Sequence, residues 1–200
     1  MKKGVRRGRF ANAGLRTAAF ALGLIVIVGC ADPALWPRWV AERDFWHARR
    51  LVDRIRVNPR FAKDSDYERA AEAFSSIGRR FPPSAWGHPA LPGAARDVAI
   101  AAGRSAIAIA KLDEMRGRVE SALAGYARAE QEWRAVPSVA LEAAIARALV
   151  LERAGRASEA LEAWGGIAAG YPMVDDERGE VIEPVMDAPL RVAAALERAG

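Results

Sequence analysis

Hydrophobic residues follow two different patterns along this chain of 200 residues. From Ala18 to Val28 they form a continuous apolar run that only Gly23 interrupts. Beyond Pro37 they recur every three or four positions among Arg and Glu, which is the period of an amphipathic α-helix. The pattern therefore predicts a short apolar leader followed by an all-α domain.

Start and stop signals divide the amphipathic part into helices. Pro59 ends the first helix, and Ser65 followed by Glu68 is a capping-box signature that opens the second. Gly117 and Gly155 fall between helices, where a glycine in the left-handed conformation is expected. The expected helices span residues 38–56, 65–80, 94–112, 119–135, 138–154, 158–169 and 189–199, with a loop at 83–93.

Several groups of residues recur at a fixed displacement, which is the signature of a repeat architecture. The interval from Gly117 to Gly155, called the repeat displacement below, also relates Ala122 and Tyr126 to Ala160 and Trp164. A second, longer interval relates Ala70, Phe74, Ile77, Phe81 and Pro82 to Ala160, Trp164, Ile167, Tyr171 and Pro172. The string Leu-Glu-Arg-Ala-Gly at 151–155 returns unchanged at 196–200.

Stacked helical hairpins explain such a repeat physically. A small residue lets two antiparallel helices approach closely, and an aromatic residue one turn later fills the space to the next hairpin. Glycine allows the turn inside a hairpin, and proline ends its second helix. The residues expected to form this packing are Ala70, Phe74, Ile77, Ala122, Tyr126, Ala148, Ala160, Trp164 and Ile167.

This pattern resembles the tetratricopeptide repeat. Ala148, Gly155, Ala160, Trp164 and Pro172 match the small, turn, small, aromatic and proline positions of that repeat in register. Three departures are Ile167, where Ala is usual, a period longer than the usual one of that repeat, and a long internal turn in the first repeat. The resemblance covers residues 38–200 and implies an α-solenoid whose concave groove binds a protein or peptide partner.

The leader has the parts of a secretory signal, with six Lys and Arg, no acidic residue and an apolar run too short for a bilayer span. Its end, Ile27-Val28-Gly29-Cys30, resembles the lipobox of bacterial lipoproteins. That resemblance implies cleavage between Gly29 and Cys30 and attachment of fatty acyl chains, such as palmitate, to Cys30. The chain is thus expected to divide into a signal peptide (1–29), a tether (30–37) and a helical-repeat domain (38–200).

Charge and composition support export rather than nucleic-acid binding. The whole chain carries a net charge of +5, but six of its 30 Lys and Arg lie in the leader, whereas all 25 Asp and Glu lie beyond it. The remainder is therefore close to neutral, and a nucleic-acid partner, which requires a surplus of cations, is not expected. Cys30 is the single cysteine, so no intramolecular disulfide is expected either.

No residues suggest catalysis, a metal site or a cofactor, so the chain is not expected to be an enzyme by itself. His47 and His88 fall in different elements, and neither has further donors at metal-binding spacing. The acidic segment at 173–188 lacks the order of a calcium loop and is expected to be a solvated loop.

Trp86, in a Pro-rich loop, is the candidate for an exposed partner contact. Trp36 and Trp39 beside the anchor suit either a membrane interface or the first hairpin.

A narrower resemblance joins the lipobox to the segment Tyr67 to Ala85, which ends Phe-Pro-Pro-Ser-Ala. Together they resemble the repeat lipoprotein of the outer-membrane β-barrel assembly machinery. The resemblance implies a non-enzymatic scaffold, anchored in the outer membrane and facing the periplasm, with the inner membrane as the other location. Two alternatives remain open: the anchor of a cell-wall enzyme whose catalytic module follows Gly200, and a carbohydrate-binding lipoprotein. The apolar last helix, which ends at a predicted hairpin turn, predicts that the repeat domain is incomplete at Gly200.

Overall fold

The computed structural model describes residues 32–89, 91, 93–171, 190–192 and 194. All regular structure within these ranges is helical, so the all-α prediction is confirmed. The elements are α2 (Leu35–Val57), the 3-10 turn η1 (Pro59–Phe61), α3 (Asp64–Arg80), the short α4 (Pro83–Trp86), α5 (Gly93–Met115), α6 (Val119–Glu132), α7 (Pro137–Arg153) and α8 (Ala157–Gly170).

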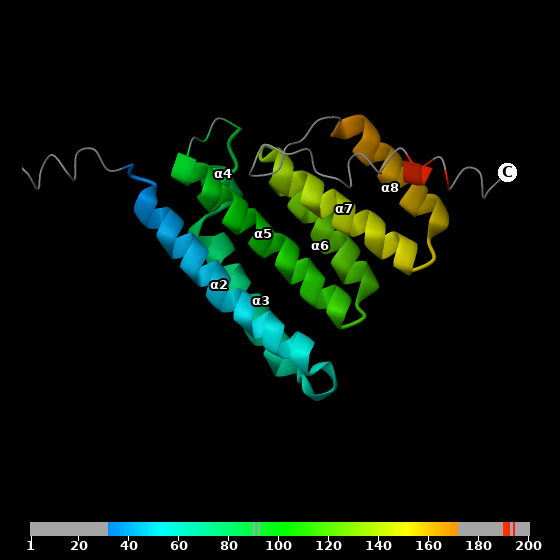
Figure 1. Ribbon diagram of the computed structural model, residues 1–200, viewed down its shortest axis with the longest axis horizontal. Helices are drawn as coiled ribbons and strands as arrows, with labels where there is room; N and C mark the ends of the chain where they lie inside the picture. Colours follow the sequence, from blue (N-terminus) through cyan, green and yellow to red (C-terminus); the bar gives the residue numbers. More distant parts are fainter. Residues whose placement is uncertain (1–31, 90, 92, 172–189, 193, 195–200) are drawn as a thin grey trace, which may run out of the picture.

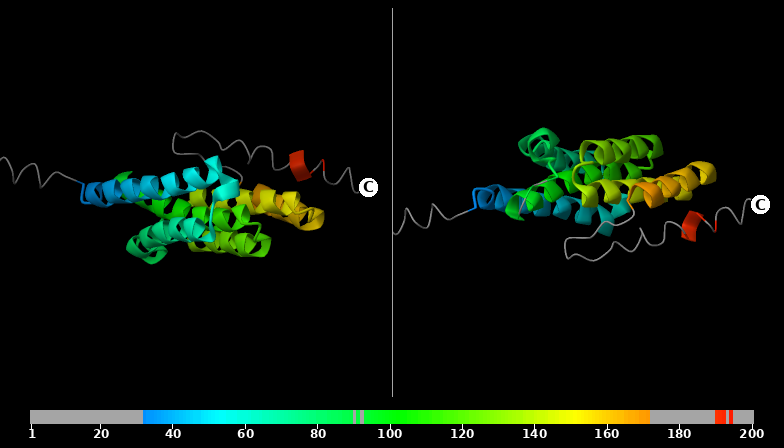
Figure 2. Two further views of the ribbon diagram at one scale, coloured as in Figure 1. Left: turned by 90° about the horizontal axis from the view of Figure 1, so that it is seen from below. Right: turned by 90° about the horizontal axis from the view of Figure 1, so that it is seen from above.

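The long helices pack in the order of the chain. Each of them contacts the next, and α2, α5 and α7 also contact one another in succession. Figure 1 shows α2, α5 and α7 side by side with α3 and α6 behind them, and Figure 2 shows α2 in one layer with α3 and α4 in the other. Short connections force this arrangement, because a helix that follows a tight turn must fold back against its predecessor.

Two sequence predictions about element boundaries are wrong. The expected loop at 83–93 begins with the helical turn α4, because Pro83 supplies a preset φ at the first helical position. The capping box of Ser65 and Glu68 does not form, because α3 begins at Asp64 and Ser65 is already helical. Asp66 takes that role instead: its Oδ2 accepts a hydrogen bond of 3.0 Å from the Lys63 backbone N–H.

Gly117 and Gly155 end α5 and α7 in the predicted way. Both have φ of +72°. At each end the glycine N–H bonds the carbonyl three residues back, and the next N–H bonds the carbonyl five residues back, at 2.9 to 3.0 Å. This pair of bonds is the Schellman motif, which satisfies the last carbonyls of a helix and turns the chain sharply. The same motif thus precedes both α6 and α8, whose first residues, Val119 and Ala157, are separated by the repeat displacement.

Alanine and glycine set how closely the helices approach. Ala41, Ala48, Ala70, Ala122 and Ala148 have no exposed surface at all. Gly125 of α6 lies so near α5 that an added Cβ would be 2.8 Å from Cβ of Ala110 and 3.3 Å from its Cα. These atoms cannot rotate away, so α5 and α6 are in contact at the limit that glycine allows.

We expect Gly125→Ala to destabilise the fold by about 1–3 kcal/mol, because α5 and α6 must separate to accept the methyl group. Gly165 is the matched control: it also lies inside a helix and is half-buried, but an added Cβ meets nothing within 4 Å. Gly165→Ala should stabilise by about 0.5–1 kcal/mol through helix propensity. Urea unfolding of the two variants checks this, and an equal effect on both would contradict the close contact.

Candidate partner-binding surfaces

The nine residues predicted to pack the repeats all lie in the interior. Ala70, Phe74 and Ile77 of α3 are at most 2% exposed, and Ala122 and Tyr126 of α6 at most 1%. The remaining four, Ala148, Ala160, Trp164 and Ile167, are also buried, on α7 and α8. These side chains therefore build the frame of the molecule, and any surface for a partner must be formed by other residues.

The structure extends the predicted pair Ala122 and Tyr126 to a row of four packing residues. Ala122, Tyr126, Ala129 and Trp133 of the α6 region are buried at the same spacing as the row from Ala70 to Phe81. Comparing the sequence with itself at the interval from Ala70 to Ala122 would have revealed the row. The aromatic residues that follow α3, α6 and α8, namely Phe81, Trp133 and Tyr171, each donate a backbone N–H to the carbonyl four residues back, at 2.8 to 3.1 Å.

A polar cluster links α5, α6 and α7 around Glu114, whose side chain is 16% exposed. Its carboxylate accepts hydrogen bonds from Tyr126 Oη at 2.9 Å and Lys111 Nζ at 2.9 Å. Arg153 Nη2 of α7 lies 2.7 Å from the same carboxylate. The partly buried charge is thus neutralised by groups from three helices, which fixes their relative positions.

The same cluster recurs one repeat later. Glu152 accepts a hydrogen bond of 2.8 Å from Trp164 Nε1 and lies 3.1 Å from Arg191 Nη1. The repeat displacement relates Glu152, Trp164 and Arg191 to their counterparts Glu114, Tyr126 and Arg153. Arg191 also stacks over the Trp164 ring at 4.8 Å. The polar contacts of these glutamates therefore recur at the repeat displacement, as the buried apolar residues do.

Two furrows lie between the helices of the second layer. The first furrow, of about 590 Å³, lies between α3 and α6, and α5 also lines it. The second, of about 640 Å³, lies between α6 and α8, and α7 also lines it. Side chains that line the first include Ala106, Ile109, Asp113, Ala124 and Arg128. The residues at the repeat displacement from these five also line the second furrow, namely Ala144, Arg147, Leu151, Glu162 and Gly166.

The chemistry of the two furrows differs although their positions correspond. Where the first has Ile109 and Ala124, the second has Arg147 and Glu162. Arg147 Nη2 lies 3.3 Å from Glu130 Oε2, whereas its buried Nε has no hydrogen-bond partner among the described residues. At two other matched positions the difference is reversed, because the first furrow has Asp113 and Arg128 where the second has Leu151 and Gly166. Each furrow therefore combines apolar and charged side chains, but at different places.

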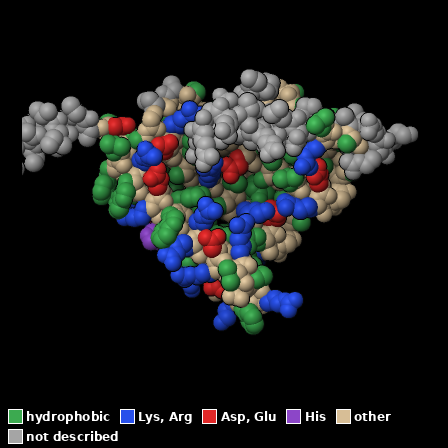
Figure 3. All heavy atoms as spheres, in the orientation of Figure 1, with side chains coloured by type: hydrophobic (Ala, Val, Ile, Leu, Met, Phe, Trp, Pro, Cys, Tyr) green, Lys and Arg blue, Asp and Glu red, His purple; other side chains and the backbone are tan. Residues whose placement is uncertain are grey.

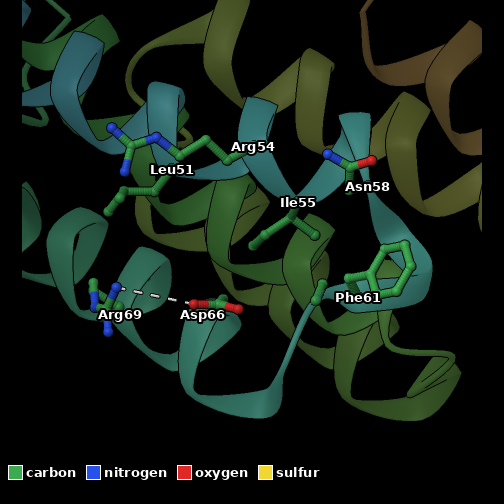
Figure 4. A pocket seen from close by; sticks show the side chains of 8 residues that line it. Leu51, Arg54, Ile55, Asn58, Phe61, Asp66 and Arg69 are labelled. Carbon is green, nitrogen blue, oxygen red and sulfur yellow. Dashed lines mark ion pairs between the residues drawn. The ribbon is translucent and has the colours of Figure 1, made fainter.

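A third, smaller hollow of about 170 Å³ lies at the tip of the first hairpin (Figure 4). Leu51 and Ile55 of α2 form its wall, and the Asp66–Arg69 ion pair, at 3.9 Å, borders it from α3. Phe61 of η1 points outward beside it and is 82% exposed. It is smaller than either furrow, so the two furrows are the larger candidate surfaces.

The other predicted site residues lie apart from the furrows. Trp86 of α4 is half-buried and packs edge-on against Phe81, with ring centres 5.7 Å apart, so it covers the core more than it faces solvent. His47 on α2 and His88 after α4 are exposed and belong to separate elements. Gly29, Cys30, the acidic segment 173–188 and most of the helix expected at 189–199 lie outside the described residues.

Comparison with family models, curated proteins and solved structures finds no match for this chain. Within the described ranges, no three His, Cys, Asp or Glu side chains are grouped as metal ligands. None of the helices described is long and apolar enough to cross a bilayer.

We expect Tyr126→Phe to lower the free energy of unfolding by about 1–2 kcal/mol at neutral pH, because Glu114 loses a charge-assisted hydrogen bond. Burial, and then the charge of Glu114, raise the pKa of Tyr126 above its ordinary value of 10.0. The folded state therefore holds this proton more tightly, and the stability from Tyr126 is present below pH 10 and is lost as the pH rises beyond it.

The difference in stability between the native chain and Tyr126→Phe should thus shrink above pH 10. Urea unfolding at several pH values measures it. Glu120→Gln, which removes an 82% exposed partner of Arg156, is the control and should change stability little. A stability difference that does not depend on pH would contradict the proposed state of Tyr126.

Proposed function

We propose that this chain is a lipid-anchored scaffold of the bacterial envelope, built as a tetratricopeptide-like solenoid, that binds an extended segment of a protein partner. The lipid is attached at Cys30, and the repeats face the periplasm, with the outer membrane as the anchor site. Assembly of outer-membrane proteins or maintenance of the envelope is the process this scaffold serves.

The regular packing of the described helices supports the solenoid. Hairpins α5–α6 and α7–α8 share the Schellman turn, the buried Ala and aromatic pair and the Glu-centred cluster, all related by the repeat displacement. Hairpin α2–α3 shares the buried Ala70 and Phe74. A helical hairpin of this kind cannot bury its apolar faces alone, so a stack of such units is the expected outcome.

The pair of corresponding furrows is the observation that carries the binding proposal. They lie on successive hairpins, so one elongated segment placed across α3, α6 and α8 could occupy both. Their linings share position but differ in chemistry, with Ile109 in one and Arg147 in the other. A surface whose furrows repeat in position but differ in side chains can bind an extended protein segment and can also select its sequence.

The experiment places a photo-crosslinking amino acid at Ala124 in the first furrow and at Glu162 in the second, both exposed, in cells that make the full chain. We expect the two positions to give the same crosslinked partner, because one segment spans both furrows. Asp53 of α2, exposed and outside every hollow described, is the control and should give no such product. Equal crosslinking from Asp53, or none from either furrow, would contradict the proposal.

A further inference from the structure

The side of α2 that faces away from the other helices carries aromatic and basic residues. Ala34, Ala41, Ala48 and Ile55 recur every seven residues and are buried. The opposite side presents residues at steps of three and four, which share one face of a helix. They are Trp36, Trp39, Arg43, Trp46, Arg50, Arg54 and Val57, called the α2 stripe below.

The α2 stripe is strongly exposed, and one exposed acidic residue, Asp53, lies on the same face, three residues after Arg50 and four before Val57. Trp36 is 71% exposed, Trp39 50%, Trp46 52% and Val57 74%. Figure 3 shows hydrophobic side chains beside Lys and Arg along the edge of the molecule that α2 forms. Exposed aromatic rings grouped on one face mark an interaction surface, since single exposed hydrophobic residues are common but such groups are not.

Contacts within the α2 stripe hold positive charge beside the rings. Trp36 and Trp39 stack with centroids 5.2 Å apart. The guanidinium of Arg43 lies 4.8 Å from the centre of Trp39, and that of Arg50 lies 4.7 Å from the centre of Trp46. Arg43 also pairs with Asp44 at 2.6 Å, which leaves Arg50 and Arg54 as the less neutralised cations of the stripe.

We infer that the α2 stripe lies on the surface of a phospholipid bilayer that contains anionic lipids. Tryptophan rings are favoured at the level of the headgroups, because they are apolar with one polar N–H. Arginine side chains extend to the phosphates while their stems remain on apolar surface. A helix whose exposed face carries three tryptophans and three arginines against one aspartate matches the chemistry of that interface.

Two further observations favour a membrane over a protein partner. Helix α2 carries six Arg against three Asp and Glu, a surplus that anionic headgroups complement. The lipid proposed at Cys30 precedes Trp36 by six residues, which span at most about 22 Å when extended. The stripe then continues for about 30 Å of helix, so α2 would lie along the bilayer. The lipid at Cys30 is part of the proposed function, and the inference rests on it for the anchor. The exposed residues of the α2 stripe are observed without that lipid.

The test places a single cysteine at Val57, at the end of the stripe far from Cys30, and labels it with a polarity-sensitive fluorophore. The control is Ser84→Cys: Ser84 is exposed and lies on α4, in the layer opposite α2 (Figure 2). Each full-length chain is reconstituted into vesicles of zwitterionic lipid with and without phosphatidylglycerol. We expect a several-fold rise and a blue shift of emission at position 57 in anionic vesicles, with no change at position 84.

Adding Trp36→Ser, Trp39→Ser and Trp46→Ser to the Val57→Cys chain should abolish this response, and circular dichroism verifies the fold. A label at 57 that stays in water overturns the inference. A response that follows protein concentration rather than lipid composition overturns it too, in favour of a second copy of the chain. Labelling of the unsubstituted chain reports the anchor separately, because an acylated Cys30 takes no label. If Cys30 does react, the emission at positions 57 and 84 is compared again with Cys30→Ser in every chain. That comparison then shows whether the α2 stripe contacts the bilayer.

Discussion

The contact of one helix with the next through alanine and glycine is the constraint on which the rest of this structure depends. Gly125 against Ala110 brings α5 and α6 so close that no larger residue fits, and Ala122 and Ala148 are fully buried. Aromatic rings one turn away, such as Tyr126 and Trp164, then fill the space to the next helix. The other hairpins have buried alanines at equivalent places, Ala70 of α3 and Ala160 of α8, and the two furrows lie between the second-layer helices of successive hairpins.

Polar groups reinforce the same geometry. Glu114 and Glu152 stand at equivalent places, and each receives a hydrogen bond from the aromatic residue of its own hairpin and an arginine from the next. A carboxylate that is partly removed from water is costly unless it is paired. The cluster at Glu114, the more buried of the two carboxylates, therefore disfavours other registers of one hairpin on the next, which apolar packing between alanines would distinguish poorly.

Much of the frame could be predicted from the sequence, because it depends on local signals. Gly117 and Gly155 end their helices as expected, and the predicted boundaries of the described helices lie within three residues of those observed. The furrows could not be predicted, since they join α3, α6 and α8 across the fold. The cap on α3 was not predicted because both Asp66 and Glu68 are acidic residues that suit a capping box. Which of them accepts the backbone hydrogen bond depends on the residue at which the helix begins, and α3 begins at Asp64.

The central claim is that the repeats act while held at a membrane by a lipid on Cys30. The proposed anchor would account for the stripe of tryptophan and arginine on α2, which begins six residues after Cys30, and it would place both furrows within the envelope. Metabolic labelling with radioactive palmitate tests this most directly. We expect the native chain to incorporate palmitate and Cys30→Ser to abolish the incorporation. A native chain without label, or a Cys30→Ser chain that keeps it, would contradict the claim.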